Sequence, residues 1–314
     1  MGTTYNVVVV DQARLLDQNM LEAAVAKTLI EVNAAYSNWD PDSEVSRLNK
    51  SLSLEPIQIS EGLADMVALT NDIYERTSGK LDLTLKPVID LWGFGPSGTV
   101  TKQPQGNALE AAMQFVGQRT VIKLSEDRTT LTKLSPEASI DLSSIAKGYG
   151  IDAVANTLAE KGATDFLVEI GGDLFVSGTS ARGTDWRIGI EKPIAGARAL
   201  ETAIDLSDKG MATSGDYRNY FEDVGARFSH IIDPQTGRPI THKTASVTVI
   251  AEDAVRADAW ATALLALGAD RGLDVANSQN LAVLFIVRAG DKDELVFNTI
   301  SNTLFEQYQS GSEG

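Results

Sequence analysis

The feature that most constrains this chain is the segment at residues 256–268, RADAWATALLALG. Alanine and leucine are strong helix formers, and a glycine directly after such a run is typical of a helix C-terminus. The apolar residues Trp260, Ala263, Leu264 and Leu267 recur at the i, i+3, i+4, i+7 spacing of one helical face. The segment therefore predicts a helix with a face packed in the core.

The same helix carries two oxygen-bearing side chains, Asp258 and Thr262, four residues apart and so on one face. Leu265 lies beside them, so we expect this face to be shielded from water as well. A buried carboxylate needs a partner, and carboxylate and hydroxyl oxygens suit a hard cation such as Mg²⁺. A carboxylate that caps the helix is the simpler interpretation, and the helix taken alone favours it.

The overall composition excludes several classes of function. The chain has 314 residues, a formal net charge of −16 and no cysteine. The negative charge argues against a nucleic-acid or anionic-membrane surface, and the lack of cysteine excludes disulfides and thiolate chemistry. No run of about 18 apolar residues occurs, so no segment is predicted to span a bilayer. The length allows one large domain or two smaller ones.

Strand and helix patterns are mixed along the chain without regular βαβ alternation, which favours an α+β fold with mostly antiparallel sheets and packed helices. The predicted helices cover residues 14–36, 62–77, 107–118, 256–268 and 271–277, with another that follows residue 141 and ends near 160. The predicted strands cover residues 5–10, 120–125, 129–134, 166–170, 174–176, 186–191, 201–206, 228–232, 245–251 and 281–287. Residues 82–90 are expected to be extended or irregular because Pro87 lies inside them.

Two local patterns allow a chemical and a structural interpretation. Residues 93–98, GFGPSG, match G-x-G-x-x-G, but no clean strand precedes them and no helix follows, so they predict a turn-rich loop. His230 stands before an apolar pair and a turn-forming segment, where it could act as a general base or simply pack, and both alternatives stay open. His242 lies in a polar stretch and is expected at the surface.

Two further segments could meet a phosphate. Residues 143–150 place two serines and a lysine at an expected helix N-terminus, where backbone amides attract phosphate, although a serine cap explains them more simply. Residues 213–220 contain one fixed cation, Arg218, which could contact a phosphate. A turn between strands is the simpler interpretation of that segment.

Taken together, short motifs occur in one order over nearly the whole chain. They are MGT at 1–3, DSE at 42–44, DLT at 82–84, LWGFG at 91–95, DLS at 141–143, EIGG at 169–172, TSG at 213–215, YRNY at 217–220, SHIIDP at 229–234, TGRP at 236–239 and DAWAT at 258–262. In this combination the chain resembles the ApbE family, the FAD:protein FMN transferases.

The resemblance implies one ApbE-like domain over residues 1–314, or two lobes of it with the FAD site between them. It implies that a threonine hydroxyl of a target flavoprotein attacks the FMN-side phosphorus of FAD in the presence of Mg²⁺. AMP leaves, and FMN stays bound to the threonine through a phosphoester. Two alternatives are an FAD pyrophosphatase, which releases FMN and AMP, and a flavin-binding protein without turnover.

The resemblance also assigns roles to residues. The Asp258 and Thr262 side chains and the Ala146 carbonyl would bind Mg²⁺, and His230 would take the threonine proton. Arg218 is our own additional candidate for a phosphate contact. By the same correspondence, the residues that line FAD are Met1, Trp39, Lys80, Leu81, Asp82, Ser143, Lys147, Tyr149 and Ile232.

Partners and location follow from the same resemblance. The acceptors would be flavin-carrying subunits of the sodium-pumping NADH:quinone oxidoreductase and related electron-transport complexes, with no nucleic-acid partner. Many relatives are exported lipoproteins of the bacterial periplasm, and others are cytoplasmic. The MGT motif usually follows the export segment, so its place at residues 1–3 suggests a trimmed form, with membrane contact only through a lipid anchor outside this chain.

Overall fold

The computed structural model describes residues 2–96, 98, 103–104, 106–194, 196, 199–217, 220–223, 226–290 and 296–309. The chain divides into two compact units. The first unit comprises Met1–Val32, Ile145–Tyr217 and Lys243–Gly314, and the second comprises Asn33–Ser144 and Arg218–His242. Each unit thus combines segments that lie far apart in the sequence.

The first unit is built on a seven-stranded sheet in the order β1-β5-β6-β9-β14-β15-β16. All its neighbouring strands pair antiparallel. The strands are β1 (Tyr5–Val9), β5 (Phe166–Ile170), β6 (Asp173–Ser177), β9 (Lys209–Gly215), β14 (Thr244–Ala251), β15 (Ala282–Arg288) and β16 (Phe297–Ser301). Antiparallel pairing of mixed elements confirms the predicted α+β class.

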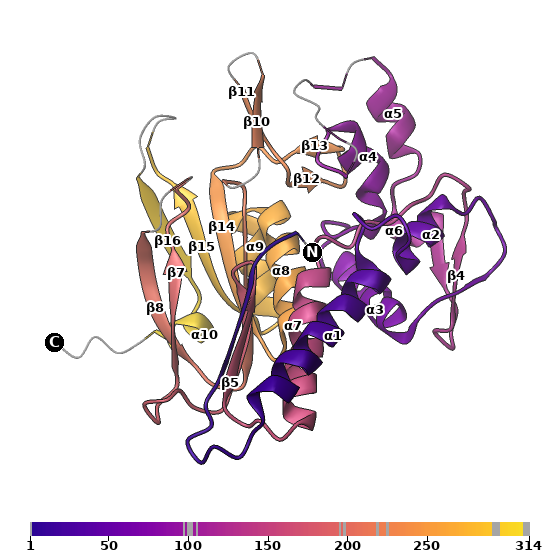
Figure 1. Cartoon of the computed structure of the whole chain (residues 1–314). Helices are drawn as coiled ribbons and strands as arrows, with labels where there is room; N and C mark the ends of the chain where they lie inside the picture. Colours follow the sequence, from indigo (N-terminus) through magenta and orange to yellow (C-terminus); the bar gives the residue numbers. More distant parts are fainter. Residues whose placement is uncertain are drawn as a thin grey trace. The chain divides into compact units, whose positions relative to one another are not determined.

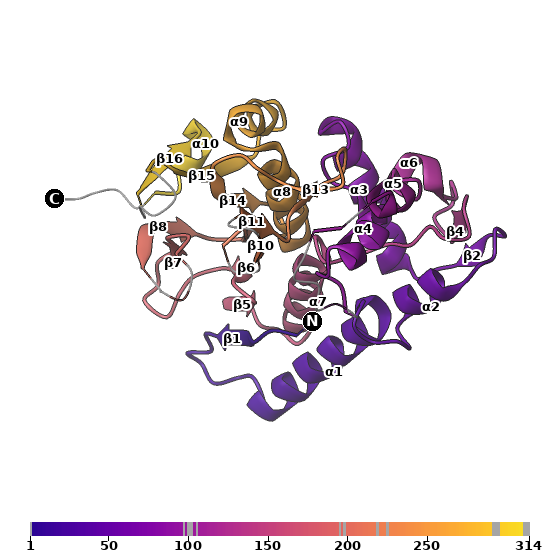
Figure 2. The ribbon, with the colours of Figure 1, turned by 90° about the horizontal axis from the view of Figure 1, so that it is seen from above.

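The two faces of this sheet are covered differently, because successive strand residues point to opposite sides. Helices α7 (Ala146–Glu160) and α8 (Ala254–Leu267) lie against one face (Figures 1 and 2). The hairpin of β7 (Trp186–Glu191) and β8 (Leu200–Leu206) packs its isoleucines and leucine on the other face. The remaining helices are α1 (Gln18–Tyr36), which begins in this unit, α9 (Ala269–Ser278) and α10 (Thr303–Glu306).

Helix α8 lies in close backbone contact with its neighbours at its N-terminus. A Cβ at Gly148 of α7 would lie 2.3 Å from the carbonyl oxygen of Ala254, and one at Gly210 of β9 would lie 2.3 Å from the carbonyl carbon of Asp253. Glycine at these two positions therefore lets the helix start sit against both α7 and the sheet. Nearly all of α8 is consequently buried, as its apolar spacing predicts.

The first amides of α8 are satisfied by two carboxylates. Asp253 is the N-cap and accepts the Arg256 amide at 2.9 Å. Asp152 of α7 accepts the amides of Ala254 and Val255 at 2.9 and 2.8 Å. The N-terminal amides of α8, which have no partner within the helix, thus donate to Asp253 at its N-cap and to Asp152 of α7. The bonds to Asp152 fix the position of α7 along α8.

The second unit consists of short elements. Its helices are α2 (Glu44–Lys50), α3 (Glu61–Arg76), the 3₁₀ helix η1 (Leu83–Leu85), α4 (Lys86–Leu91), α5 (Ala108–Met113) and α6 (Gln118–Val121). A three-stranded sheet joins β2 (Ile57–Gln58), β4 (Thr130–Lys133) and β3 (Ile122–Leu124), and two hairpins join β10 (Tyr220–Asp223) to β11 (Ala226–Ser229) and β12 (Ile232–Asp233) to β13 (Arg238–Pro239). One of its cores gathers Leu85, Val88, Trp92 and Ile232.

Several local predictions were wrong. Residues 82–90 are largely helical, because Pro87 stands in the first turn of α4, where a missing N–H costs no hydrogen bond. The predicted strand at 228–232 is interrupted at His230, between β11 and β12. Residues 213–215 belong to strand β9, so the turn predicted between strands begins only at residue 216, and His242 is half-buried instead of exposed.

Other boundaries differ less. The helix predicted at 107–118 is the shorter α5, the strand predicted at 120–125 is only β3 because α6 precedes it, and helix α2 was not predicted. Among the residues that the structure describes, no helix has the length and apolar character that crossing a bilayer requires.

We expect Gly148→Ala to lower the free energy of unfolding by about 1–3 kcal/mol, because the added methyl group meets backbone that cannot turn aside. Urea unfolding measures this change. The control Gly189→Ala adds the same group 2.9 Å from the Leu200 Cδ1 only, on a side chain that is 62% exposed. The control should stay within about 0.5 kcal/mol of the wild type. Equal stability of the two variants would contradict the close contact.

Burial raises the pKa of Asp152 to about 7, although two amide hydrogen bonds favour its charged form. The unfolded chain gives up this proton near its ordinary pKa of about 3.9, so the group's contribution to stability is complete below that pH and is lost as the pH rises through 7. As the pH rises from about 5 to about 8, the free energy of unfolding of the wild type should therefore fall by about 1–3 kcal/mol more than that of Asp152→Asn. Parallel pH curves of unfolding for the two proteins would refute this.

Candidate active site

Asp258 lies inside α8 and is 2% exposed. Because Asp253 caps α8, the capping role considered for Asp258 in its own helix is wrong. Its carboxylate instead accepts two hydrogen bonds from the first turn of α7, one from the Gly148 amide and one from the Lys147 ammonium, both at 2.9 Å. The acid is thus held by a neighbouring helix.

The second predicted ligand, Thr262, follows one turn later and is half-buried. Its Oγ1 lies 3.1 Å from Oγ of Ser214 on β9. The third predicted ligand, Ala146, is the first residue of α7 and immediately precedes Lys147, which contacts Asp258. The structure therefore brings the predicted metal-binding residues into one unit, around the start of α7 and one face of α8.

Lys147 joins Asp258 to a second acid, Asp173 at the start of β6. The other oxygen of Asp173 accepts the Thr213 amide at 2.9 Å, which ties the group to β9. We call these three residues the Asp173–Lys147–Asp258 cluster. Both acids are at most 2% exposed, so two buried carboxylates share one ammonium.

The charges of this cluster depend on one another. Desolvation disfavours the ammonium, yet the carboxylates of Asp173 and Asp258 raise the pKa of Lys147 above its ordinary value. Burial raises the pKa of Asp173, and the lysine opposes that change. Since two acids share one cation, the cluster favours the approach of a further cation.

Asp173 was missed by the sequence analysis. It directly follows the Gly171-Gly172 turn, and its partner in the hairpin register is Ile170. The side chains of Ile170 and Val168 face α7, so Asp173 lies on the helix-covered face of the sheet. An acid at an inward-facing strand position was the signal that could have identified it.

The start of α7 differs from the simpler interpretation of its sequence. The N-cap position is Ile145, which makes no capping bond through its side chain, so the predicted serine cap is wrong. Ser143 is exposed, and its amide donates to Asp141 at 2.8 Å. Tyr149, a predicted FAD contact, is half-buried within α7.

His230 lies in the second unit, in the break between β11 and β12, and is half-buried. Its imidazole meets the ring of Phe94 in an edge-to-face contact, with ring centroids 6.3 Å apart and an interplanar angle of 68°. His230 therefore packs against an aromatic ring and lies on a segment outside any regular strand.

The predicted FAD-lining residues at 80–82 are engaged with the protein itself. The Lys80 ammonium lies 2.7 Å from Oδ1 of Asp233. Asp82 accepts the Thr84 and Gln118 amides at 2.7 and 3.1 Å, and burial raises its pKa. Leu81 and Ile232 are 2% and 5% exposed. These predicted FAD-lining side chains are therefore either paired within the protein or buried.

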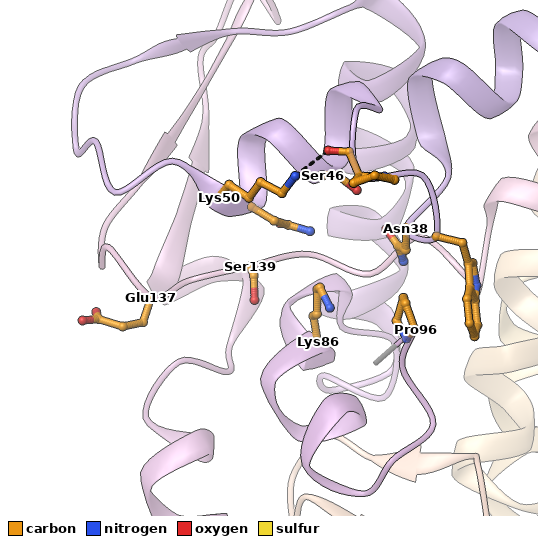
Figure 3. Close-up of a pocket in the computed structure, with 10 residues that line it drawn as sticks. Asn38, Ser46, Lys50, Lys86, Pro96, Glu137 and Ser139 are labelled. Atoms are coloured by element: carbon orange, nitrogen blue, oxygen red, sulfur yellow. Dashed lines mark hydrogen bonds between the residues drawn. The ribbon is translucent and has the colours of Figure 1, made fainter. Parts of the chain in front are cut away.

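Trp39, the remaining described candidate in this unit, is 66% exposed and lines a pocket of about 380 Å³. Figure 3 shows Asn38, Lys50, Lys86 and Ser139 arranged around this pocket, with Glu137 pointing away at its edge. Of the predicted FAD-lining residues that the structure describes, Trp39 is the one that lines it. Met1 and Arg218 lie outside the described residues.

The profile of the ApbE family matches residues 1–285. The chain belongs to the ApbE family. The FAD:protein FMN transferase of Haemophilus influenzae is 41% identical to it over 323 residues, which cover 100% of this chain and 90% of the relative. That of Escherichia coli K12 is 40% identical over 257 residues, 81% of this chain and 73% of the relative.

Solved structures agree with the family assignment. The flavin transferase ApbE from Vibrio cholerae superposes with a TM-score of 0.89 at 38% identity, covering 98% of this chain and 96% of that one. The ApbE protein of Thermotoga maritima gives a TM-score of 0.86 at 26% identity, with coverage of 98% and 96%. This ApbE-family chain is therefore an enzyme, a flavin transferase that uses FAD, and its predicted family and fold are confirmed.

Lys147→Met keeps most of the side-chain volume but removes the ammonium that two buried acids share. We expect it to lower the free energy of unfolding by about 3–5 kcal/mol near neutral pH, measured by urea unfolding without added divalent metal. Adding Asp173→Asn should restore part of the loss, because one unpaired carboxylate is then gone. The control Lys27→Met removes a lysine whose side chain is 78% exposed. A Lys147→Met variant as stable as this control would disprove the role of the cluster.

Proposed function

We propose that this ApbE-family enzyme transfers FMN from FAD to a threonine hydroxyl of a target flavoprotein. The threonine oxygen forms a bond to the FMN-side phosphorus, and the bond from that phosphorus to the bridging oxygen breaks. AMP leaves with the bridging oxygen, and the threonine proton passes to a base. The product carries FMN through a phosphoester.

Magnesium fits the residues at the start of α7 and on α8. The donor set is a carboxylate, a hydroxyl and a backbone carbonyl, from Asp258, Thr262 and Ala146, and Mg²⁺ prefers such oxygen ligands. In the described part of the chain no group of three or more acidic, histidine or cysteine side chains could hold a metal, so phosphate oxygens and water would complete the shell. When bound, the ion would neutralise charge on the phosphates.

The chain's own residues have separate tasks in this proposal. Lys147 and the Gly148 amide hold the Asp258 carboxylate in one orientation. His230 takes the threonine proton, since a half-buried imidazole is the side chain best suited to accept a proton near neutral pH. Trp39, exposed at the edge of its pocket, offers a flat surface to a ring of FAD.

The acceptors we infer are flavin-carrying subunits of the sodium-pumping NADH:quinone oxidoreductase and related electron-transport complexes. We place the reaction in the periplasm, with a lipid anchor as the membrane attachment of the native protein. Both inferences rest on the resemblance to the ApbE family; the relatives' name, FAD:protein FMN transferase, itself supports only a flavoprotein acceptor.

One observation carries the proposal: the buried carboxylate of Asp258, presented by α8 beside the Thr262 hydroxyl and held by α7. A buried acid with hydroxyl and carbonyl groups nearby explains how a protein with a net charge of −16 can receive an anionic dinucleotide through a metal.

The test is to incubate the chain with FAD, Mg²⁺ and a candidate acceptor domain and to record the intact mass of the acceptor. A gain of one FMN with release of AMP is the expected result. AMP without labelled acceptor would instead indicate a pyrophosphatase, and intact FAD would indicate a flavin-binding protein without turnover.

Two variants separate the assigned roles. His230→Ala should keep FAD binding but transfer FMN at least about 100-fold more slowly, whereas His242→Ala, the control at the other histidine, should be near wild type. Asp258→Ala should lose its response to Mg²⁺ and most activity. Unchanged transfer in either site variant would remove the role assigned to that residue.

A further inference from the structure

The segment that carries His230 has little regular structure of its own. We call residues 228–239 the His230 arm. Residues 228–229 end strand β11, which pairs with β10, and the arm's own hairpin after His230 pairs Ile232 with Pro239 and Asp233 with Arg238. A ladder of this length is at best marginal by itself, so the position of His230 must depend on contacts with the rest of the second unit.

One set of contacts fixes the turn of the arm. Lys80 places its ammonium 2.7 Å from Oδ1 of Asp233, and the two side chains are 7% and 21% exposed. The same carboxylate oxygen accepts the Gln235 amide at 3.0 Å, and the Gln235 side chain donates to the Ser78 carbonyl at 2.8 Å. Lys80 is therefore the charged anchor of a turn that begins three residues after His230.

A second set of contacts lies on the aromatic side of the arm. The indole N–H of Trp92 donates to the Gly237 carbonyl at 2.8 Å, and the same ring stacks on Phe228 at 5.7 Å. Phe94, two residues after Trp92, meets the His230 ring itself. The arm is thus held on both sides of the histidine, by an ion pair at one place and by aromatic rings at the other.

Lys80 is itself fixed. Its amide donates to Thr77 Oγ1 at 3.2 Å, in the turn that ends α3. The Lys80 side chain is 7% exposed, so the surrounding protein restricts its stem, and a buried pair of this kind is poorly screened by solvent. The ion pair between Lys80 and Asp233 therefore links the arm to the turn that follows α3.

We propose that Lys80 is a positioning residue: through Asp233 it fixes the His230 arm and so keeps the imidazole against Phe94. This inference rests on the proposed role of His230 as the base. It gives the Lys80 side chain a task other than direct contact with FAD. A displacement of about 1 Å at a reacting group can cost about 100-fold in rate, so such an anchor matters to catalysis.

The test must remove the ion pair without leaving a lone buried charge, which could unfold the protein. The variant Lys80→Met/Asp233→Asn removes both charges at once. Lys80→Gln, as a second variant, keeps a hydrogen-bond donor for Asp233. Lys133→Met is the matched control, because Lys133 is a 2% exposed lysine of the same unit whose ammonium bonds to the Ser51 carbonyl, away from the arm.

The primary measurement is the proton NMR spectrum of the imidazoles. The chain has two histidines, so His242→Ala assigns the remaining ring signals to His230. In the double variant these signals should lose the ring-current shift that Phe94 gives them and move towards those of an exposed imidazole. Lys80→Gln should give a smaller shift in the same direction, and Lys133→Met none.

The second measurement is FMN transfer. The double variant should lose about 10- to 100-fold in kcat while the KM for FAD stays within about threefold. Unmoved His230 signals in the folded double variant overturn the inference whatever the activity, and so do moved signals with full kcat when His230→Ala has lost transfer. If His230→Ala retains transfer, the proposed base is wrong, but the NMR result still decides whether Lys80 positions the imidazole.

Discussion

The bond between the buried carboxylate of Asp258 and the first turn of α7 is the contact on which the first unit's site depends. A carboxylate so far removed from water is tolerated only with strong partners, and here a lysine and a backbone amide supply them. Through Asp173 the same lysine reaches β6, and the Thr213 amide extends the link to β9. Two helices and two strands therefore meet at one set of charges.

The two units hold their candidate functional side chains by different physical means. Asp258 and Thr262 stand on a helix that is buried on nearly every side, so their positions follow from core packing. His230 stands in a break between two short hairpins and is held by side-chain contacts, an ion pair and aromatic rings. The buried helix α8 therefore fixes its oxygen ligands by packing alone, whereas His230 is placed correctly only when the side-chain contacts that hold its segment are intact.

Much of the fold was predictable because it depends on short-range geometry. The spacing of Trp260, Ala263, Leu264 and Leu267 identified α8, and the strand patterns at 166–170 and 174–176 identified β5 and β6. The prediction was wrong where two local rules compete. Pro87 excludes a helix interior but is well suited to a helix start, and the sequence around it did not show which of these it occupies.

The sequence by itself determined the family, the class of fold and the placement of Asp258 and Thr262 on one helical face. That placement is a consequence of the helical repeat, which acts over four residues. Only the tertiary structure decided what these residues touch. Lys147 pairs with two acids that lie 26 and 111 residues away in the sequence, and Lys80 pairs with Asp233, which lies 153 residues away. Backbone geometry fixes neighbours along the chain, but partners at such distances are chosen by packing of the whole unit.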